Sequence, residues 1–149
     1  AGMKLLVAID FSDPTDLILR VAKRLAAGLD ASVWIVHAAE PEPDFIGYDA
    51  GPEVVRGQVA RELRDEHRRL QDYAEQLREA GVETKAILVQ GPTVEALLEM
   101  AEKQGSDLIV VGSHGRGMVG EMLMGSVSQG LIRAGRCPVT VVPVGRGKD

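Results

Sequence analysis

The feature that most constrains the fold of this chain is a regular alternation between short apolar runs and longer segments of helical periodicity. Five runs rich in Val, Ile and Leu recur along the 149 residues: Lys4–Ile9, Ser32–His37, Glu83–Val89, Leu108–Val111 and Val139–Val144. Near-continuous apolar runs of this kind are typical of parallel strands covered on both faces. Because crossovers between parallel strands are right-handed, the alternation predicts an α/β fold, a doubly wound open parallel five-stranded sheet with helices on both faces.

The segments between the runs have apolar residues at intervals of three and four, as amphipathic helices do. The first helix is predicted to begin after an N-cap at Asp13, with Pro14 in its first position, and to stop at Gly28. The other three are predicted over about Glu53–Ala80, from Thr93 to near Gly105, and over Val127–Ala134. The segment Glu40–Gly51 breaks all periodicity and is predicted to be a loop at the carboxyl end of the second strand.

Composition and charge argue against several classes of protein. The net charge of −5 disfavours nucleic-acid binding, and the single cysteine, Cys137, excludes an internal disulfide and a Cys-rich metal site. No apolar run approaches the roughly 18 residues of a membrane span. We therefore expect one cytoplasmic domain over residues 3–146, without membrane or nucleic-acid partners. Ala1 and Gly2, which precede Met3, are expected to be remnants of cloning.

A glycine-punctuated segment, Gly112–Ser128, joins the fourth strand to the fourth helix. Glycines between a strand and a helix N-terminus let backbone N–H groups approach phosphate oxygens. A Walker A motif is absent from the sequence. Gly115–Gly120 satisfies G-x-G-x-x-G, but it follows the fourth strand, and residues 131–147 contain no acidic residue to hold a ribose. A phospho-receiver domain would need an aspartate where the third strand ends in Val89-Gln90-Gly91.

The pattern that fits best is G-x2-G-x9-G-[ST], formed by Gly112, Gly115, Gly125 and Ser126. Small residues at these positions and a serine at a helix N-terminus indicate a phosphate-binding loop. Two simpler interpretations stay open. Gly125-Ser126 can be an ordinary turn and helix cap, and Asp10 can cap the helix that follows the first strand.

Several motifs in order make the chain similar to a known family. They are Val7-Ala-Ile-Asp-Phe-Ser12, Val33-Trp-Ile-Val-His37, Gly112-Ser-His-Gly-Arg116, Gly125-Ser-Val-Ser128 and Cys137-Pro-Val-Thr-Val-Val142. Together they resemble single-domain universal stress proteins of the ATP-binding kind, from Lys4 to Val144. The resemblance implies an adenine nucleotide alpha hydrolase-like sheet in the order 3-2-1-4-5.

The same resemblance implies a site for ATP, or for ADP or AMP. Asp10 would contact the adenosine and the backbone of Ala38 the adenine edge. The phosphates would meet Gly112, Gly115, Gly125, Ser126, Val127 and Ser128, with Arg116 at an often basic position. Ile9, Val111 and His114 complete the expected nucleotide-binding set, and no catalytic residue or direct metal ligand is expected. Since Arg116 is the one basic residue of the loop, Mg²⁺ or Mn²⁺ held through the phosphates is a further expectation.

The function implied is that of a nucleotide-dependent stress-response regulator, with an unidentified protein partner. A homodimer is expected through the last strand, Val139–Val144, because an unprotected sheet edge invites pairing. Two alternatives remain open: a slow ATPase or nucleotidyl-transfer enzyme using the same loop, and a nucleotide-free dimerisation scaffold. No carboxylate or histidine has a spacing that assigns it to an attacking water, so the binding protein is preferred over the enzyme.

Overall fold

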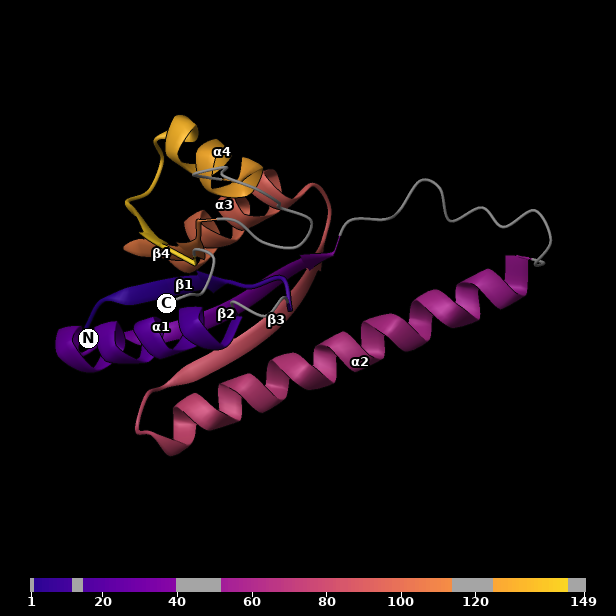
Figure 1. Ribbon diagram of the computed structural model, residues 1–149, viewed down its shortest axis with the longest axis horizontal. Coiled ribbons are helices and arrows are strands. Elements are labelled where there is room, and N and C mark those ends of the chain that lie inside the picture. Colours follow the sequence, from indigo (N-terminus) through magenta and orange to yellow (C-terminus); the bar gives the residue numbers. More distant parts are fainter. Residues whose placement is uncertain (1, 12–14, 40–51, 114–124, 145–149) are drawn as a thin grey trace.

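The sheet has five strands in the order β3-β2-β1-β4-β5, and every neighbouring pair is parallel (Figure 1). The computed structural model describes residues 2–11, 15–39, 52–113 and 125–144, without the side chains of 52–59. The strands are β1 (Lys4–Ala8), β2 (Ser32–Ala39), β3 (Thr84–Gln90), β4 (Leu108–Gly112) and β5 (Val139–Val142). The predicted fold class and strand order are both confirmed.

Alternate residues of the central strand β1 pack into two separate cores. Leu5 and Val7 face the cluster built with helices α1 (Thr15–Leu29) and α2 (Pro52–Glu79). Leu6 and Ala8 face the cluster built with α3 (Thr93–Gln104) and α4 (Ser126–Ala134). This period of two places one helix pair on each face of the sheet (Figure 1). The strands are therefore apolar on both sides, as the sequence predicts.

Two predicted boundaries differ from the structure for local reasons. The first helix does not stop at Gly28; it continues to Leu29, and Asp30 takes the left-handed conformation with φ of 53°. Asp tolerates that conformation better than most residues, so the turn needs no glycine. The last strand ends at Val142 rather than at Val144, because Pro143 has no N–H for the ladder. The predicted cap at Asp13 and Pro14 lies outside the described residues.

Helices α3 and α4 pack closely through a glycine. A Cβ atom added to Gly130 would lie 2.8 Å from Val94 Cγ2, inside van der Waals contact. Helix α2 is much longer than the strand it covers, and in Figure 1 its N-terminal part extends past the end of β3. Among its residues from 60 onward, whose side chains the structure describes, the buried ones are Leu70, Ala74 and Leu77. None of the described helices is long and apolar enough to cross a membrane.

Candidate functional site

The carboxyl ends of β1, β2 and β4 meet at one edge of the sheet, and five of the predicted site residues lie there. Ala8 is in register with Val36 of β2, and Val7 with Val110 of β4. Continuing this register pairs Asp10 with Ala38 at the end of β2, and pairs Ile9 with Gly112 and Asp10 with Ser113 at the end of β4. Strand β1 is also where the order of the sheet reverses, which is where open α/β sheets bind ligands.

Ile9 and Val111 are buried at this edge, and Asp10 is half-buried. The N–H of Ile9 donates to Val36 O at 3.1 Å, so the pairing of β1 with β2 continues beyond the strand itself. The Ile9 side chain packs into the core on the α1 and α2 face and that of Val111 into the core on the α3 and α4 face, so the two residues flank the edge from opposite faces of the sheet. Asp10, the residue after Ile9, is intermediate in exposure at the same edge.

Ser113, directly after β4, ties the strand ends to the start of α4. Its N–H donates to Val142 O at 2.8 Å, and its hydroxyl accepts from the N–H of Val144 at 3.1 Å. Its carbonyl accepts from the N–H of Gly125 at 2.5 Å and from the Ser128 hydroxyl at 3.1 Å. Ser113 thus fixes α4 beside the end of β4. The sequence analysis missed this role, because it depends on contacts with residues distant along the chain.

The N-terminus of α4 carries backbone donors with no side-chain cap. Gly125 is the N-cap residue, in extended conformation with φ of −83° and ψ of 173°, and no side chain caps the helix. The N–H groups of the first turn, on Ser126, Val127 and Ser128, have no carbonyl partner within the helix. These donors and the helix dipole make the end of α4 electropositive. An anion could therefore bind there without displacing a side chain.

The two serines of this turn differ in what they can offer a ligand. Ser128 is 1% exposed, and its hydroxyl lies 3.1 Å from both Ser113 O and Gly125 O, to which it donates. Its hydroxyl therefore stabilises the turn, and its N–H is what remains for a ligand. Ser126 is exposed, so both its hydroxyl and its N–H are accessible.

Phe11 follows Asp10 in a conformation that the sequence analysis did not foresee. Its φ is 62°, in the left-handed region, and its ring is 7% exposed. The ring centroid lies 4.6 Å from that of His37 and 6.4 Å from that of Tyr73, and Arg69 Cζ lies 4.5 Å above the ring. The turn at Phe11 buries its ring beneath α2 directly after Asp10. No motif in the sequence indicated this turn; the sequence shows only that aromatic residues such as Phe11 are rare in the chain.

His37 connects β2 to this cluster and to the candidate site. Its Nδ1 lies 2.8 Å from Ile9 O, and because a carbonyl can only accept, Nδ1 must carry the proton. Nε2 lies 3.6 Å from Glu66 Oε2 of α2, a pair that is ionic only when His37 is protonated. His37 is 9% exposed, so it belongs to the core beneath the site.

Three predicted site residues, His114, Gly115 and Arg116, lie outside the described residues, as does the predicted loop Glu40–Gly51. The structure therefore brings together Ile9, Asp10, Ala38, Val111, Gly112, Gly125, Ser126, Val127 and Ser128 at one edge. In the described part of the chain, no group of three or more His, Cys, Asp or Glu side chains gathers in a way that could hold a metal ion.

The chain is similar to known proteins in both sequence and structure. A model of the universal stress protein family matches residues 3–143. A universal stress protein of Thermus aquaticus, named for its gene's position in the QAH/OAS sulfhydrylase 3′ region, is 35% identical over 139 residues. That match covers 93% of this chain and 96% of the relative.

Two solved structures are similar over nearly the whole chain. MJ0577, a universal stress protein of Methanocaldococcus jannaschii, superposes with a TM-score of 0.82 at 26% identity, covering 99% of this chain and 98% of its own. A universal stress protein solved in complex with cAMP superposes with a TM-score of 0.64 at 25% identity, covering 95% and 97% respectively.

Proposed function

The chain belongs to the universal stress protein family, and from this premise we propose that it binds an adenine nucleotide at the carboxyl edge of its sheet. The observation that carries the proposal is the N-terminus of α4, which has no side-chain cap and is tied to the end of β4 through Ser113. A similar universal stress protein binds cAMP, which favours an adenine nucleotide over other phosphorylated ligands.

The proposed phosphate contacts are the first-turn N–H groups of α4, on Ser126, Val127 and Ser128, together with the Ser126 hydroxyl. Gly112 and Gly125 have no side chains to keep phosphate oxygens away from the backbone. Each hydrogen bond to a charged oxygen contributes about 1.5–3 kcal/mol, so three or four such bonds are enough for micromolar binding. His114, Gly115 and Arg116 of the connecting loop are proposed to complete the phosphate site.

The proposed adenosine contacts lie at the carboxyl ends of β1, β2 and β4. We assign the ribose or base to Asp10 and the adenine edge to the backbone of Ala38, with Ile9 and Val111 as the flanking residues of the same edge. ATP is the proposed ligand, with ADP and AMP as weaker ones, since each phosphate removed takes away acceptors for the α4 donors. Mg²⁺ or Mn²⁺ would be held through the phosphates rather than by side chains.

The biological role we propose is nucleotide-dependent regulation of a stress response in the cytoplasm. One domain over residues 3–146 would carry it out, as a homodimer joined through the region of β5. Strand β5 is an edge strand of the sheet, and Val139, Thr140 and Val141 on it are only partly buried. Exposed edge strands of this kind pair readily with a second copy. Sedimentation with and without ATP would test the dimer, and cell fractionation its location.

The nucleotide proposal is tested by titrating ATP into the wild type and into Ser126→Asp by calorimetry. An aspartate in the first turn interacts favourably with the helix dipole, by about 0.3–1 kcal/mol, so the variant should fold at least as well. Its carboxylate would repel phosphate, and we expect binding to weaken about thirtyfold, or about 2 kcal/mol. Ser126→Ala, which removes only the hydroxyl, is the matched control and should weaken binding by about tenfold or less.

Two outcomes would contradict the proposal. The first is wild-type protein that binds neither ATP nor AMP at millimolar concentration. The second is Ser126→Asp that binds ATP as tightly as the wild type, since the phosphates would then lie elsewhere.

A further inference from the structure

Strand β3 is an edge strand, and half of its backbone hydrogen-bonding groups point away from the sheet. Val33 N donates to Glu83 O and Gly91 N donates to Ala39 O, so the odd-numbered residues of this segment bond to β2. In a parallel pair, the alternate residues direct their N–H and C=O groups to the other side. Thr84, Ala86, Leu88 and Gln90 therefore form the outer edge of β3.

The first half of this edge is covered by side chains of α2. Arg78 Nε donates to Thr84 O at 2.8 Å, and Gln71 Nε2 donates to Ala86 O at 3.3 Å. His67 Nε2 lies 3.4 Å from the same Gln71 nitrogen and helps to orient it. Side chains that bond an edge in this way keep it from pairing with other strands.

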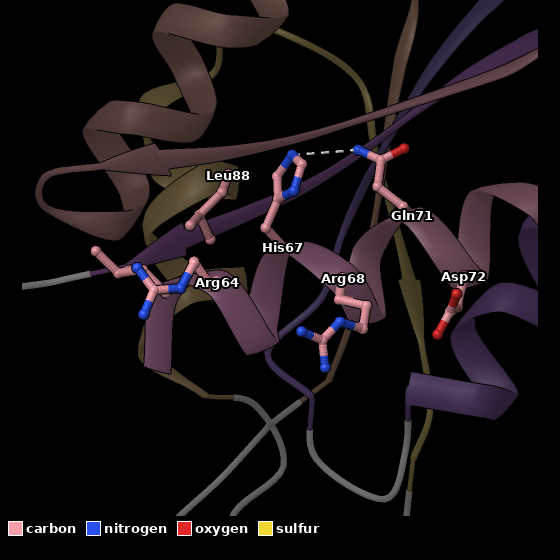
Figure 2. A pocket seen from close by; sticks show the side chains of 7 residues that line it. Arg64, His67, Arg68, Gln71, Asp72 and Leu88 are labelled. Atoms are coloured by element: carbon pink, nitrogen blue, oxygen red, sulfur yellow. Dashed lines mark hydrogen bonds between the residues drawn. The ribbon is translucent and has the colours of Figure 1, made fainter. Parts of the chain in front are cut away.

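The second half of the edge opens into a pocket instead. In the part of the chain that the structure describes, no side chain bonds the outward backbone groups of Leu88 or Gln90. A pocket of about 620 Å³ lies beside Leu88, between β3 and α2. Figure 2 shows its α2 side chains projecting from successive turns of the helix, with Leu88 next to them. They are Leu63, Arg64, His67, Arg68, Gln71 and Asp72.

The pocket has a basic wall on a protein whose net charge is −5. Arg64, His67 and Arg68 lie at helical spacing on one side of α2, and Asp72 is the acidic residue among the lining side chains. Arg68 pairs with Asp65 at 3.6 Å, but both side chains are about 70% exposed, and such surface pairs exchange readily with other charges. Among the described residues, no ion pair engages Arg64. The local charge therefore favours an acidic ligand.

We propose that the edge of β3 at Leu88–Gln90 and the basic wall of α2 form a docking site for an extended acidic peptide segment of a partner protein. The peptide adds to the sheet beside β3 through backbone hydrogen bonds. Its alternate side chains point toward α2, where carboxylates meet Arg64 and Arg68. An aliphatic side chain on the same face of the peptide, two residues before or after the carboxylates, packs on Leu63 and Leu88. None of the proposed nucleotide-binding residues lines this pocket, so the inference does not rest on the nucleotide proposal.

The test is a selection of random peptides of about seven residues, the length of an ordinary strand, against the folded wild-type protein. Recovered peptides are then titrated into the double variant Arg64→Glu/Arg68→Glu. The matched control is Arg20→Glu/Arg24→Glu, which reverses an exposed pair of the same spacing on α1. We expect peptides with Asp or Glu at alternate positions, binding about tenfold more weakly to the α2 variant and within about twofold to the control.

A second measurement separates strand addition from simple charge attraction. The same peptide with alternate backbone nitrogens methylated keeps its charges but cannot pair along β3, and it should bind about tenfold more weakly. Free glutamate at millimolar concentration should not compete.

Four results would overturn the inference. They are a selection that recovers no peptides or peptides without acidic enrichment, equal binding by the two arginine variants, no effect of methylation, and competition by free glutamate. Self-association lost only in the α2 variant would assign the edge to a second copy of the chain instead.

Discussion

The left-handed conformation of Phe11 predicts an unusual order of stability. At this position a glycine variant should be more stable than an alanine variant, the reverse of the order in regular helices and strands. Phe11 has φ of 62° and is 7% exposed, with its ring packed against His37 and Tyr73 and under Arg69. Two substitutions separate the contribution of the ring from that of the backbone. Phe11→Ala removes the ring and leaves a Cβ, whereas Phe11→Gly removes both.

The expected free energies follow from burial and from φ. Phe11→Ala should lower the free energy of unfolding by about 3–5 kcal/mol, as large-to-small changes of a buried Phe do. In a regular helix or strand, Gly is less stable than Ala by about 0.5–1 kcal/mol. At φ of 62° a Cβ is itself unfavourable by about 1–2 kcal/mol, so Phe11→Gly should be more stable than Phe11→Ala by about 1 kcal/mol.

Urea denaturation of the three proteins, followed by circular dichroism, measures both differences from the midpoints at equal m-values. The reasoning about the turn is refuted if Phe11→Gly unfolds at a lower urea concentration than Phe11→Ala. The reasoning about the ring is refuted if Phe11→Ala lowers the free energy of unfolding by less than about 1 kcal/mol, because removing a buried ring loses its packing and leaves a cavity.

Three further predictions concern glycine packing, the turn before α4 and the single cysteine. Gly28→Ala, where an added Cβ meets nothing within 4 Å, should stabilise the protein by about 0.5–1 kcal/mol. Gly130→Ala, which drives a Cβ into stiff Val94, should destabilise it by about 1 kcal/mol; equal thermal melts of the two variants would contradict this. Ser128→Ala should lower the melting temperature by about 2–4 °C by removing about 1 kcal/mol of hydrogen bonding, and an unchanged melt would show that the buried hydroxyl stabilises nothing. Burial and, to a smaller extent, the charge of Asp107 raise the pKa of Cys137 above that of an ordinary thiol, so at pH 8 iodoacetamide should alkylate it more slowly than a free peptide thiol. An equal rate would contradict this prediction.

The architecture could be predicted because the apolar runs leave few alternatives. Strands as continuously apolar as Lys4–Ala8 have to be covered on both faces, and strand–helix alternation then requires a parallel sheet. The strand order came from the resemblance rather than from the pattern. The error at Gly28 has a simple cause: a glycine permits a helix to end but does not require it, and here Asp30 makes the turn.

The organisation of the candidate site could be predicted only in part. The motif spacing indicated which residues would gather, and the register of β1, β2 and β4 explains why Asp10, Ala38 and Gly112 do so. The central role of Ser113 could not be seen, because its partners come from β5 and α4 and depend on the folded sheet. Nor did the sequence indicate that the Ser128 hydroxyl bonds the turn, because side-chain direction at a helix start follows from packing.

The measurement that tests the central claim most directly is a titration of ATP into ¹⁵N-labelled protein, followed by amide chemical shifts. The account predicts saturable shifts for Asp10 and Ala38, at the ends of β1 and β2, and for Gly112, Ser126 and Val127, where β4 ends and α4 begins. Thr84, at the opposite, amino end of β3, should not move. Shifts concentrated elsewhere, or no saturable shift at millimolar ATP, would contradict the claim that this edge binds an adenine nucleotide.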